Sequence, residues 1–179
     1  MLREAVKLDL PEPQVDAAVE ELRIGVLGDG GSGRRCVCYA FCEGYSIEED
    51  ALTWLNEESQ RRTLLIAGKP RTLQVTHRTA PEGMQGAILL YNIASRVSFE
   101  EVRAIRDTLD ASLPTVLVGN KKDLPEVKRE VSAQEGLQMA NDLGAPFFET
   151  SCTTGEGVWD AFEALVTLID ARQSKCSVF

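Results

Sequence analysis

Residues 22–35 read Leu-Arg-Ile-Gly-Val-Leu-Gly-Asp-Gly-Gly-Ser-Gly-Arg-Arg. The apolar run predicts a buried strand, and the glycines after it predict a tight turn that leads into a helix. Gly28 and Gly33, followed by a basic residue, have the spacing of the phosphate-binding loop G-x-x-x-x-G-K-[ST]. In that loop the lysine reaches the outer phosphates and the hydroxyl binds magnesium. This sequence has Arg34 and Arg35 at those two positions.

The two arginines leave two interpretations of the loop open. Glycines let backbone N–H groups approach phosphate oxygens, and a helix that begins at Arg34 would point its positive end at them. In the first interpretation Arg35 places its guanidinium where the metal would sit and supports binding without magnesium. In the second both arginines are solvated and the pocket is empty, because arginine is not a conservative replacement for lysine at a crowded phosphate. The loop residues predicted to bind phosphate are Gly28, Gly30, Gly31, Ser32, Gly33, Arg34 and Arg35.

Length and charge limit the class of protein. The chain has 179 residues, of which 44% are hydrophobic and 26% charged, which suits one domain with a substantial core. Its formal net charge of -9 argues against nucleic acid as a partner, because phosphate backbones are bound by basic surfaces. No apolar run reaches transmembrane length and no signal peptide opens the chain, so we expect a soluble body.

The five cysteines lack the paired spacing of a secreted disulfide framework, which favours a reducing, intracellular compartment. His77 is the only histidine and there is no C-x-x-C pair, so a structural zinc site is not expected. We expect Cys36, Cys38 and Cys42 to pack as small hydrophobes on one helix.

Strands alternate with helices along the chain. This pattern predicts an α/β doubly wound fold, with a mainly parallel sheet and helices on both faces. Two adjacent strands around a turn at 68–70 predict one antiparallel edge hairpin. Capping boxes are predicted at Ser98 and Ser132, and a C-cap glycine at Gly144. Strands are predicted at 22–28, 63–67, 72–76, 87–92, 115–119 and 147–150, and helices at about 34–42, 47–58, 98–111, 132–144 and 158–171.

Two further motifs follow predicted strands, where ligands bind in such sheets. Asn120, Lys121 and Asp123 form N-K-x-D directly after one strand, and Ser151 and Cys152 follow the last strand. Here the sequence resembles the Ras-like small GTPases, whose base-recognition motifs are N-K-x-D and T-S-A, with cysteine in place of the alanine. The resemblance covers about residues 22–171 and implies the small-GTPase type of phosphate-loop fold.

The resemblance implies a guanine-nucleotide site that binds GTP or GDP. Asp123 would accept two hydrogen bonds from guanine, which adenine does not offer. Asn120 would connect the motif to the phosphate loop, and Lys121 would lie along the face of the base. The backbone at Ser151 and Cys152 would meet the guanine carbonyl.

The positions that would hold magnesium and drive hydrolysis depart from the family. The family uses D-T-A-G-Q after the third strand, and this sequence has Arg-Thr-Ala-Pro-Glu at 78–82. Thr53 is the nearest candidate for the metal-binding threonine, but it lies in a segment with a helix signature. With Arg35 in place of the hydroxyl, we expect no usual magnesium site, no catalytic residue and no hydrolysis by the usual route.

The last four residues, Cys176-Ser-Val-Phe179, fit the C-a-a-X prenylation motif, with geranylgeranyl favoured at Cys176. We therefore expect a protein at the cytoplasmic face of a membrane. The predicted divisions are an N-terminal extension at 1–20, the G domain at 21–171 and a C-terminal tail at 172–179.

The prediction for function is a degenerate Ras-like small G protein. It would be tethered to a membrane and act as a signalling or interaction module, with protein effectors and guanine nucleotide as partners and without nucleic acid. Two alternatives stay open: a slow GTPase that uses non-standard catalytic groups, and a scaffold without nucleotide.

Overall fold

The computed structural model describes residues 19–43, 59–77 and 83–176, with Cys176 described by its backbone alone. The predictions for an N-terminal extension before residue 19, for a helix at 47–58 and for the segment 78–82 fall outside these ranges. The strands are β1 (Glu20–Gly28), β2 (Ser59–Ile66), β3 (Lys69–Thr76), β4 (Gly86–Asn92), β5 (Thr115–Asn120) and β6 (Phe147–Thr150). The helices are α1 (Arg34–Glu43), α2 (Arg96–Asp107), the short 3-10 helix η2 (Glu126–Lys128), α3 (Ala133–Leu143) and α4 (Val158–Cys176).

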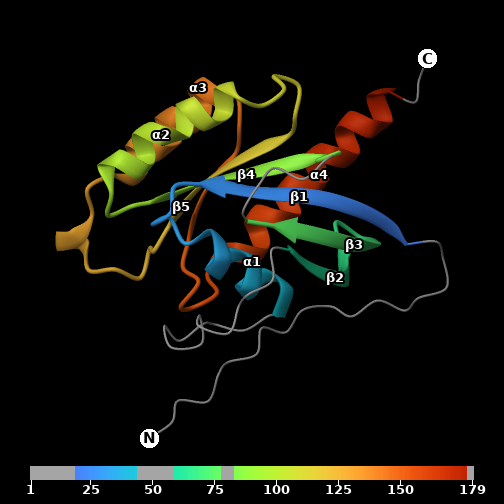
Figure 1. The fold of residues 1–179 in the computed structure, drawn as a ribbon, viewed down its shortest axis with the longest axis horizontal. Coiled ribbons are helices and arrows are strands. Elements are labelled where there is room, and N and C mark those ends of the chain that lie inside the picture. Colours follow the sequence, from blue (N-terminus) through green and yellow to red (C-terminus); the bar gives the residue numbers. More distant parts are fainter. Residues whose placement is uncertain (1–18, 44–58, 78–82, 177–179) are drawn as a thin grey trace, which may run out of the picture.

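The six strands form one sheet in the order β2-β3-β1-β4-β5-β6 (Figure 1). Neighbouring strands are parallel, except that β2 and β3 pair antiparallel. The predicted mainly parallel sheet with an antiparallel edge hairpin is therefore confirmed. The chain places β3 on one side of β1 and β4 on the other, so the strand order switches at β1. Ligands of such sheets bind beyond the carboxyl ends of the strands at this switch.

Helices cover both faces of the sheet, as predicted. Leu90 of β4 packs in a core with α1 and α4, and the next residue, Tyr91, packs in a second core with α2 and α3. Successive residues of a strand point to opposite faces, so the continuous apolar run of β4 serves both cores. Phe41 of α1 stacks on Phe162 of α4 with ring centroids 3.8 Å apart. The prediction that early cysteines pack as hydrophobes is confirmed for Cys38 and Cys42, which are buried on α1.

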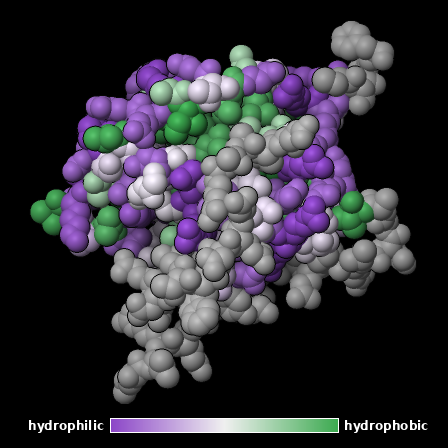
Figure 2. Space-filling model, in the orientation of Figure 1, coloured by the Kyte–Doolittle hydropathy of each residue, from purple (hydrophilic) through white to green (hydrophobic). Residues whose placement is uncertain are grey.

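Hydrophilic side chains dominate the face of the molecule in Figure 2, and hydrophobic side chains gather there in small patches. None of the helices in the described ranges is both long enough and apolar enough to cross a membrane.

The turn of the hairpin lies earlier than predicted. Ala67 and Gly68 form it with φ of 49° and 73°, whereas Lys69 and Pro70 already belong to β3. A two-residue hairpin turn of type I′ needs positive φ at both central residues, which proline cannot adopt. Pro70 pairs with Leu65 of β2 but lies before the first residue of β3 that pairs with β1, at a place where a strand tolerates proline.

The capping box predicted at Ser98 is wrong. Ser95 caps α2 and accepts a hydrogen bond from the backbone N–H of Ser98, which is buried inside the helix. The hydroxyl of Ser98 instead contacts the backbone of Asn92 at the end of β4. The capping box at Ser132 and the left-handed C-cap at Gly144, with φ of 65°, are confirmed.

The closing helix is longer than predicted. It was expected to end at Ala171 and continues to Cys176. No glycine or proline lies in this stretch, and the added turn makes contacts of its own. Arg172 donates to the hydroxyl of Ser112, and Gln173 donates to Glu20 at the start of β1. Five residues of the predicted tail therefore belong to α4.

Candidate functional site

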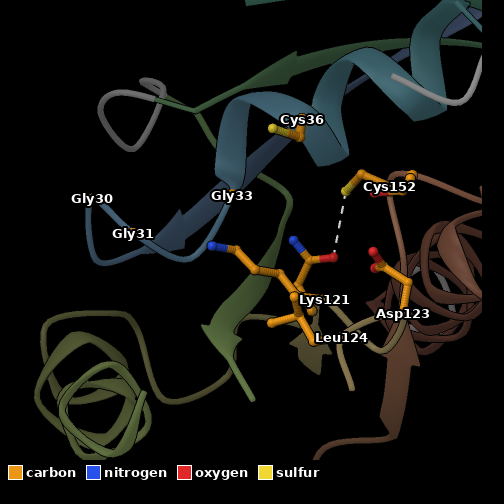
Figure 3. A pocket seen from close by; sticks show the side chains of 10 residues that line it. Gly30, Gly31, Gly33, Cys36, Lys121, Asp123, Leu124 and Cys152 are labelled. Atoms are coloured by element: carbon orange, nitrogen blue, oxygen red, sulfur yellow. Dashed lines mark hydrogen bonds between the residues drawn. The ribbon is translucent and has the colours of Figure 1, made fainter. Parts of the chain in front are cut away.

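A cavity of about 400 Å³ opens at the carboxyl ends of β1, β5 and β6 (Figure 3). Its walls come from the glycine loop after β1, the polar segment after β5 and the turn after β6. These three segments are far apart in the sequence, and the parallel sheet places their ends at one edge. The residues that line it are Gly30, Gly31, Gly33, Cys36, Asn120, Lys121, Asp123, Leu124, Cys152 and Thr153.

The glycine loop is held by hydrogen bonds within itself. The carboxylate of Asp29 accepts from the backbone N–H of Gly31 at 3.0 Å. The hydroxyl of Ser32, which is completely buried, donates to the carbonyl of Asp29 at 2.9 Å. Gly28 is packed so closely that a Cβ atom there would lie 2.1 Å from the carbonyl oxygen of Leu90. Gly28 and Ser32 therefore shape the loop from behind, and Gly30 and Gly31 form its exposed rim.

Gly33 is the point where the loop meets the segment after β5. Its φ is 91°, in the left-handed region that side chains rarely adopt, and a Cβ there would lie 2.6 Å from Nδ2 of Asn120. Both the backbone conformation and the close approach require glycine at this position.

Asn120 connects all three walls of the cavity. Its side chain is 2% exposed, and its Nδ2 donates to the carbonyl of Ser32 in the glycine loop at 2.9 Å. Its Oδ1 accepts from the hydroxyl of Thr150 at 3.0 Å and from the thiol of Cys152 at 3.4 Å. A buried amide that uses both ends in this way holds the loop at a set distance from β5 and β6.

Asp123 presents an oriented carboxylate. The buried hydroxyl of Ser151 donates to Oδ1 of Asp123 at 2.6 Å and accepts from the backbone N–H of Thr154 at 3.2 Å. The Asp123 side chain is exposed and points into the cavity (Figure 3). A carboxylate has about four acceptor positions and no donor, so one bond from Ser151 leaves room for two adjacent N–H donors of a ligand.

Lys121 lies between the glycine loop and Asp123. Its φ is 72°, an unusual value for a residue with a side chain. Its side chain extends from the segment after β5 toward the glycine loop (Figure 3). The aliphatic part of lysine can cover the flat face of a ring while the ammonium group stays near anionic groups.

The wall after β6 carries a thiol. Cys152 is 8% exposed, and burial raises the pKa of its thiol to about 12. The thiol is therefore neutral at physiological pH, and it donates to Asn120 as described above. A small, uncharged side chain suits a wall against which a flat ring would pack.

A second cavity, of about 320 Å³, lies beside the glycine loop at the start of α1. Its lining residues are Gly30, Gly33, Arg34, Arg35, Cys36 and His77. Arg34 is half-buried and Arg35 is exposed, whereas His77, directly after β3, is only 7% exposed. This cavity therefore brings two guanidinium groups and an imidazole to the end of the loop.

The structure gathers the residues predicted to bind nucleotide around the two cavities. Seven of them line the first cavity, and two more, Arg34 and Arg35, line the second cavity alone. Gly28, Ser32 and Ser151 support the walls through packing and hydrogen bonds. The structure thus shows where each of these residues lies, and the nucleotide that they are expected to bind stays a prediction.

Sequence reasoning missed four lining residues: Cys36, His77, Leu124 and Thr153. Cys36 was expected to pack only as a hydrophobe, yet it is half-buried and lines both cavities. His77 was considered only as a zinc ligand. It follows a strand that runs parallel to β1, so the rule that ligands bind at carboxyl ends of strands could have placed it beside the loop. Among the residues with described positions, no three His, Cys, Asp or Glu side chains gather to hold a metal ion.

Comparisons with known proteins bear on this site. A sequence model described as "Ras family" matches residues 23–171. Ras-like protein 1 of Saccharomyces cerevisiae is 32% identical over 169 residues, which cover 86% of this chain and 54% of that protein. Ras-like protein rasC of Dictyostelium discoideum is 32% identical over 161 residues, covering 81% of this chain and 84% of that protein. Ras-related protein Rab-13 of Canis lupus familiaris is 30% identical over 155 residues, covering 78% and 75%. The chain thus spans about half the length of the yeast relative.

Proposed function

The chain belongs to the Ras family, and from this premise we propose that it binds guanine nucleotide and acts as a signalling or interaction module with little or no GTP hydrolysis. One observation carries the proposal. The carboxylate of Asp123, oriented by Ser151, shares a cavity with a glycine loop that Asn120 holds in place. Groups suited to phosphate recognition and to base recognition thus share one space.

Guanine is the base that this arrangement favours. Its N1–H and exocyclic amine are adjacent donors, and they match the acceptor positions left on Asp123. Adenine offers an acceptor at N1, which a carboxylate would repel. Lys121 and Cys152 both line this cavity, so a lysine stem and an uncharged side chain are available to pack against a ring there. Family membership also implies guanine nucleotide and effector proteins as partners.

Magnesium, which accompanies the nucleotide in this family, does not fit the described residues. Mg²⁺ prefers oxygen ligands, and the phosphate loop normally supplies a hydroxyl directly after its basic residue. Arg35 stands at that place and has five N–H donors and no acceptor. The proposal therefore includes no step that depends on a metal ion.

The proposed lack of hydrolysis is supported by sequence at two places. Arg34 and Arg35 replace the lysine and the hydroxyl, and Arg-Thr-Ala-Pro-Glu at 78–82 replaces D-T-A-G-Q. Phosphoryl transfer in such sites depends on positioning and on neutralisation of charge, and proline has no N–H to offer a phosphate. A protein with these replacements would hydrolyse bound GTP slowly or not at all. It would act through the surface that it presents to its partners and through the nucleotide that it holds.

The lipid predicted at Cys176 and the membrane location that depends on it stay predictions. The backbone places Cys176 as the last residue of α4, so the predicted attachment point lies at the end of this helix.

The test of nucleotide binding is a thermal unfolding series with GDP, GTP and ADP on protein stripped of ligand. A ligand at about 100 times its Kd stabilises by about 2.7 kcal/mol, which raises Tm by about 5–10 °C for a chain of this size. We expect this rise with GDP or GTP and none with ADP. Asp123→Asn should abolish the rise, and the exposed Asp107→Asn on α2 is the matched control.

The outcomes separate the alternatives. If no guanine nucleotide raises Tm and Asp123→Asn changes neither stability nor partner binding, the chain is a scaffold without nucleotide. If GTP is bound and released as GDP with a rate that falls on substitution of Arg34, the chain is a slow GTPase with non-standard catalytic groups. Binding of GTP that stays intact over hours supports the proposal.

A further inference from the structure

The cavity at the start of α1 is lined by several basic side chains. Arg34 and Arg35 line it together with His77, which comes from the end of β3. Cys36, Gly30 and Gly33 complete the lining, so the cavity of about 320 Å³ is continuous with the rim of the glycine loop. Two elements thus contribute basic side chains to one space, beside the larger cavity that holds Asp123.

Arg34 and Arg35 replace different kinds of residue in the usual phosphate loop. Arg34 stands where a phosphate loop has lysine, so the charge at that position is unchanged. Arg35 stands where the loop has a neutral hydroxyl that holds Mg²⁺. The chain itself therefore supplies two positive side chains at the start of α1. The usual loop supplies one, and the bound Mg²⁺ supplies the remaining positive charge.

A guanidinium at Arg35 also changes which ligands can approach. It repels a divalent cation, and its planar set of N–H donors matches the oxygens of a phosphate group in a bidentate manner. The half-buried Arg34 and the amino end of α1 reinforce attraction for anions at the same place. His77 is 7% exposed and lines the same cavity as both arginines.

We infer that this cavity holds the outer phosphates of the bound nucleotide through Arg34 and Arg35, and that Arg35 takes the place of the divalent cation. Nucleotide affinity is then independent of magnesium. The inference rests on the proposed function, because it assumes that guanine nucleotide occupies the adjacent cavity.

The test is the Kd for GDP of the full chain, measured by isothermal titration in buffer with MgCl₂ and in buffer with EDTA. The wild-type protein should give the same Kd in both, within about twofold. Arg35→Ser should weaken binding in EDTA by about 10-fold to 100-fold, the loss expected for a charge-assisted hydrogen bond. MgCl₂ should restore part of this loss, because serine supplies the hydroxyl that the usual loop uses.

Two further variants separate a local effect of Arg35 from other causes. Arg35→Ala should lose affinity like Arg35→Ser in EDTA, but without recovery in MgCl₂, because alanine offers no oxygen. Arg103→Ser removes the same charge from the exposed face of α2, where Arg103 pairs with Asp142, and should leave the Kd unchanged. Circular dichroism of each variant checks that it is folded.

The results that overturn the inference are distinct from those that overturn the proposed function. A wild-type Kd that tightens at least about tenfold with MgCl₂, or an Arg35→Ser variant as tight as wild type in EDTA, refutes the cation replacement and leaves nucleotide binding intact. The absence of GDP binding by wild type in both buffers refutes the proposed function itself.

Discussion

Replacement of Asn120 by alanine should loosen the whole site and lower the stability of the domain. The side chain is 2% exposed and makes hydrogen bonds to Ser32 at 2.9 Å, to Thr150 at 3.0 Å and to the thiol of Cys152 at 3.4 Å. Each buried hydrogen bond contributes about 0.5–1.5 kcal/mol, and each buried polar group left without a partner costs about 1–3 kcal/mol. The thiol bond is weak, so two bonds and their stranded partners decide the magnitude. We expect Asn120→Ala to lower the free energy of unfolding by about 2–4 kcal/mol.

Urea unfolding of nucleotide-free protein, followed by circular dichroism, measures this change without any contribution from a ligand. The loss corresponds to a fall in Tm of about 5–15 °C for a chain of this size. Asn141→Ala, at an exposed position of α3, is the matched control and should change stability by less than about 0.5 kcal/mol. Asn120→Asp keeps an acceptor for Thr150 but faces the carbonyl of Ser32 with a carboxylate, so it should be at least as destabilising. An Asn120→Ala variant that unfolds like the control would refute the idea that Asn120 holds the three walls together.

Three other predictions concern stability and lipid attachment. Tyr91→Phe should raise the free energy of unfolding by about 1 kcal/mol, because the buried hydroxyl of Tyr91 has no hydrogen-bond partner among the described residues; a lower Tm in thermal unfolding would contradict this. Burial raises the pKa of the Tyr91 hydroxyl in the folded protein. Above pH 10 this hydroxyl therefore ionises more readily in the unfolded chain, so wild type should lose stability there and Tyr91→Phe should lose less. The hydrogen bond from Arg96 lowers the pKa of Glu135 from 4.5 to about 2, so its contribution to stability is present above pH 4.5 and disappears as the pH falls toward 2. Glu135→Gln should flatten this part of a plot of urea midpoint against pH, and an unchanged profile would argue against it. Finally, the full chain expressed in eukaryotic cells should carry a prenyl group that is absent from Cys176→Ser, and equal masses after correction for the substitution would disprove attachment at that residue.

Much of the fold follows from local sequence. A strand was predicted at 87–92, and the structure places alternate residues of this apolar run in two cores. The cap at Ser132 was predictable because it depends on a hydroxyl and a carboxylate three residues apart. Ser98 has the same pattern with Glu101, yet Ser95 caps the helix, because the position of β4 draws the hydroxyl of Ser98 to Asn92. Short-range patterns thus fail where a neighbouring element competes for the same polar group.

The sequence by itself determined which chemical groups follow each strand, and hence the family of this protein and the residues of its N-K-x-D motif. A glycine spacing and an N-K-x-D motif are local patterns that chain order alone reveals. Only the tertiary structure decided that Ser151 orients Asp123 and that His77 joins Arg34 and Arg35 in one cavity. These groupings join residues from segments that follow separate strands, and they depend on how the parallel sheet aligns the carboxyl ends of those strands.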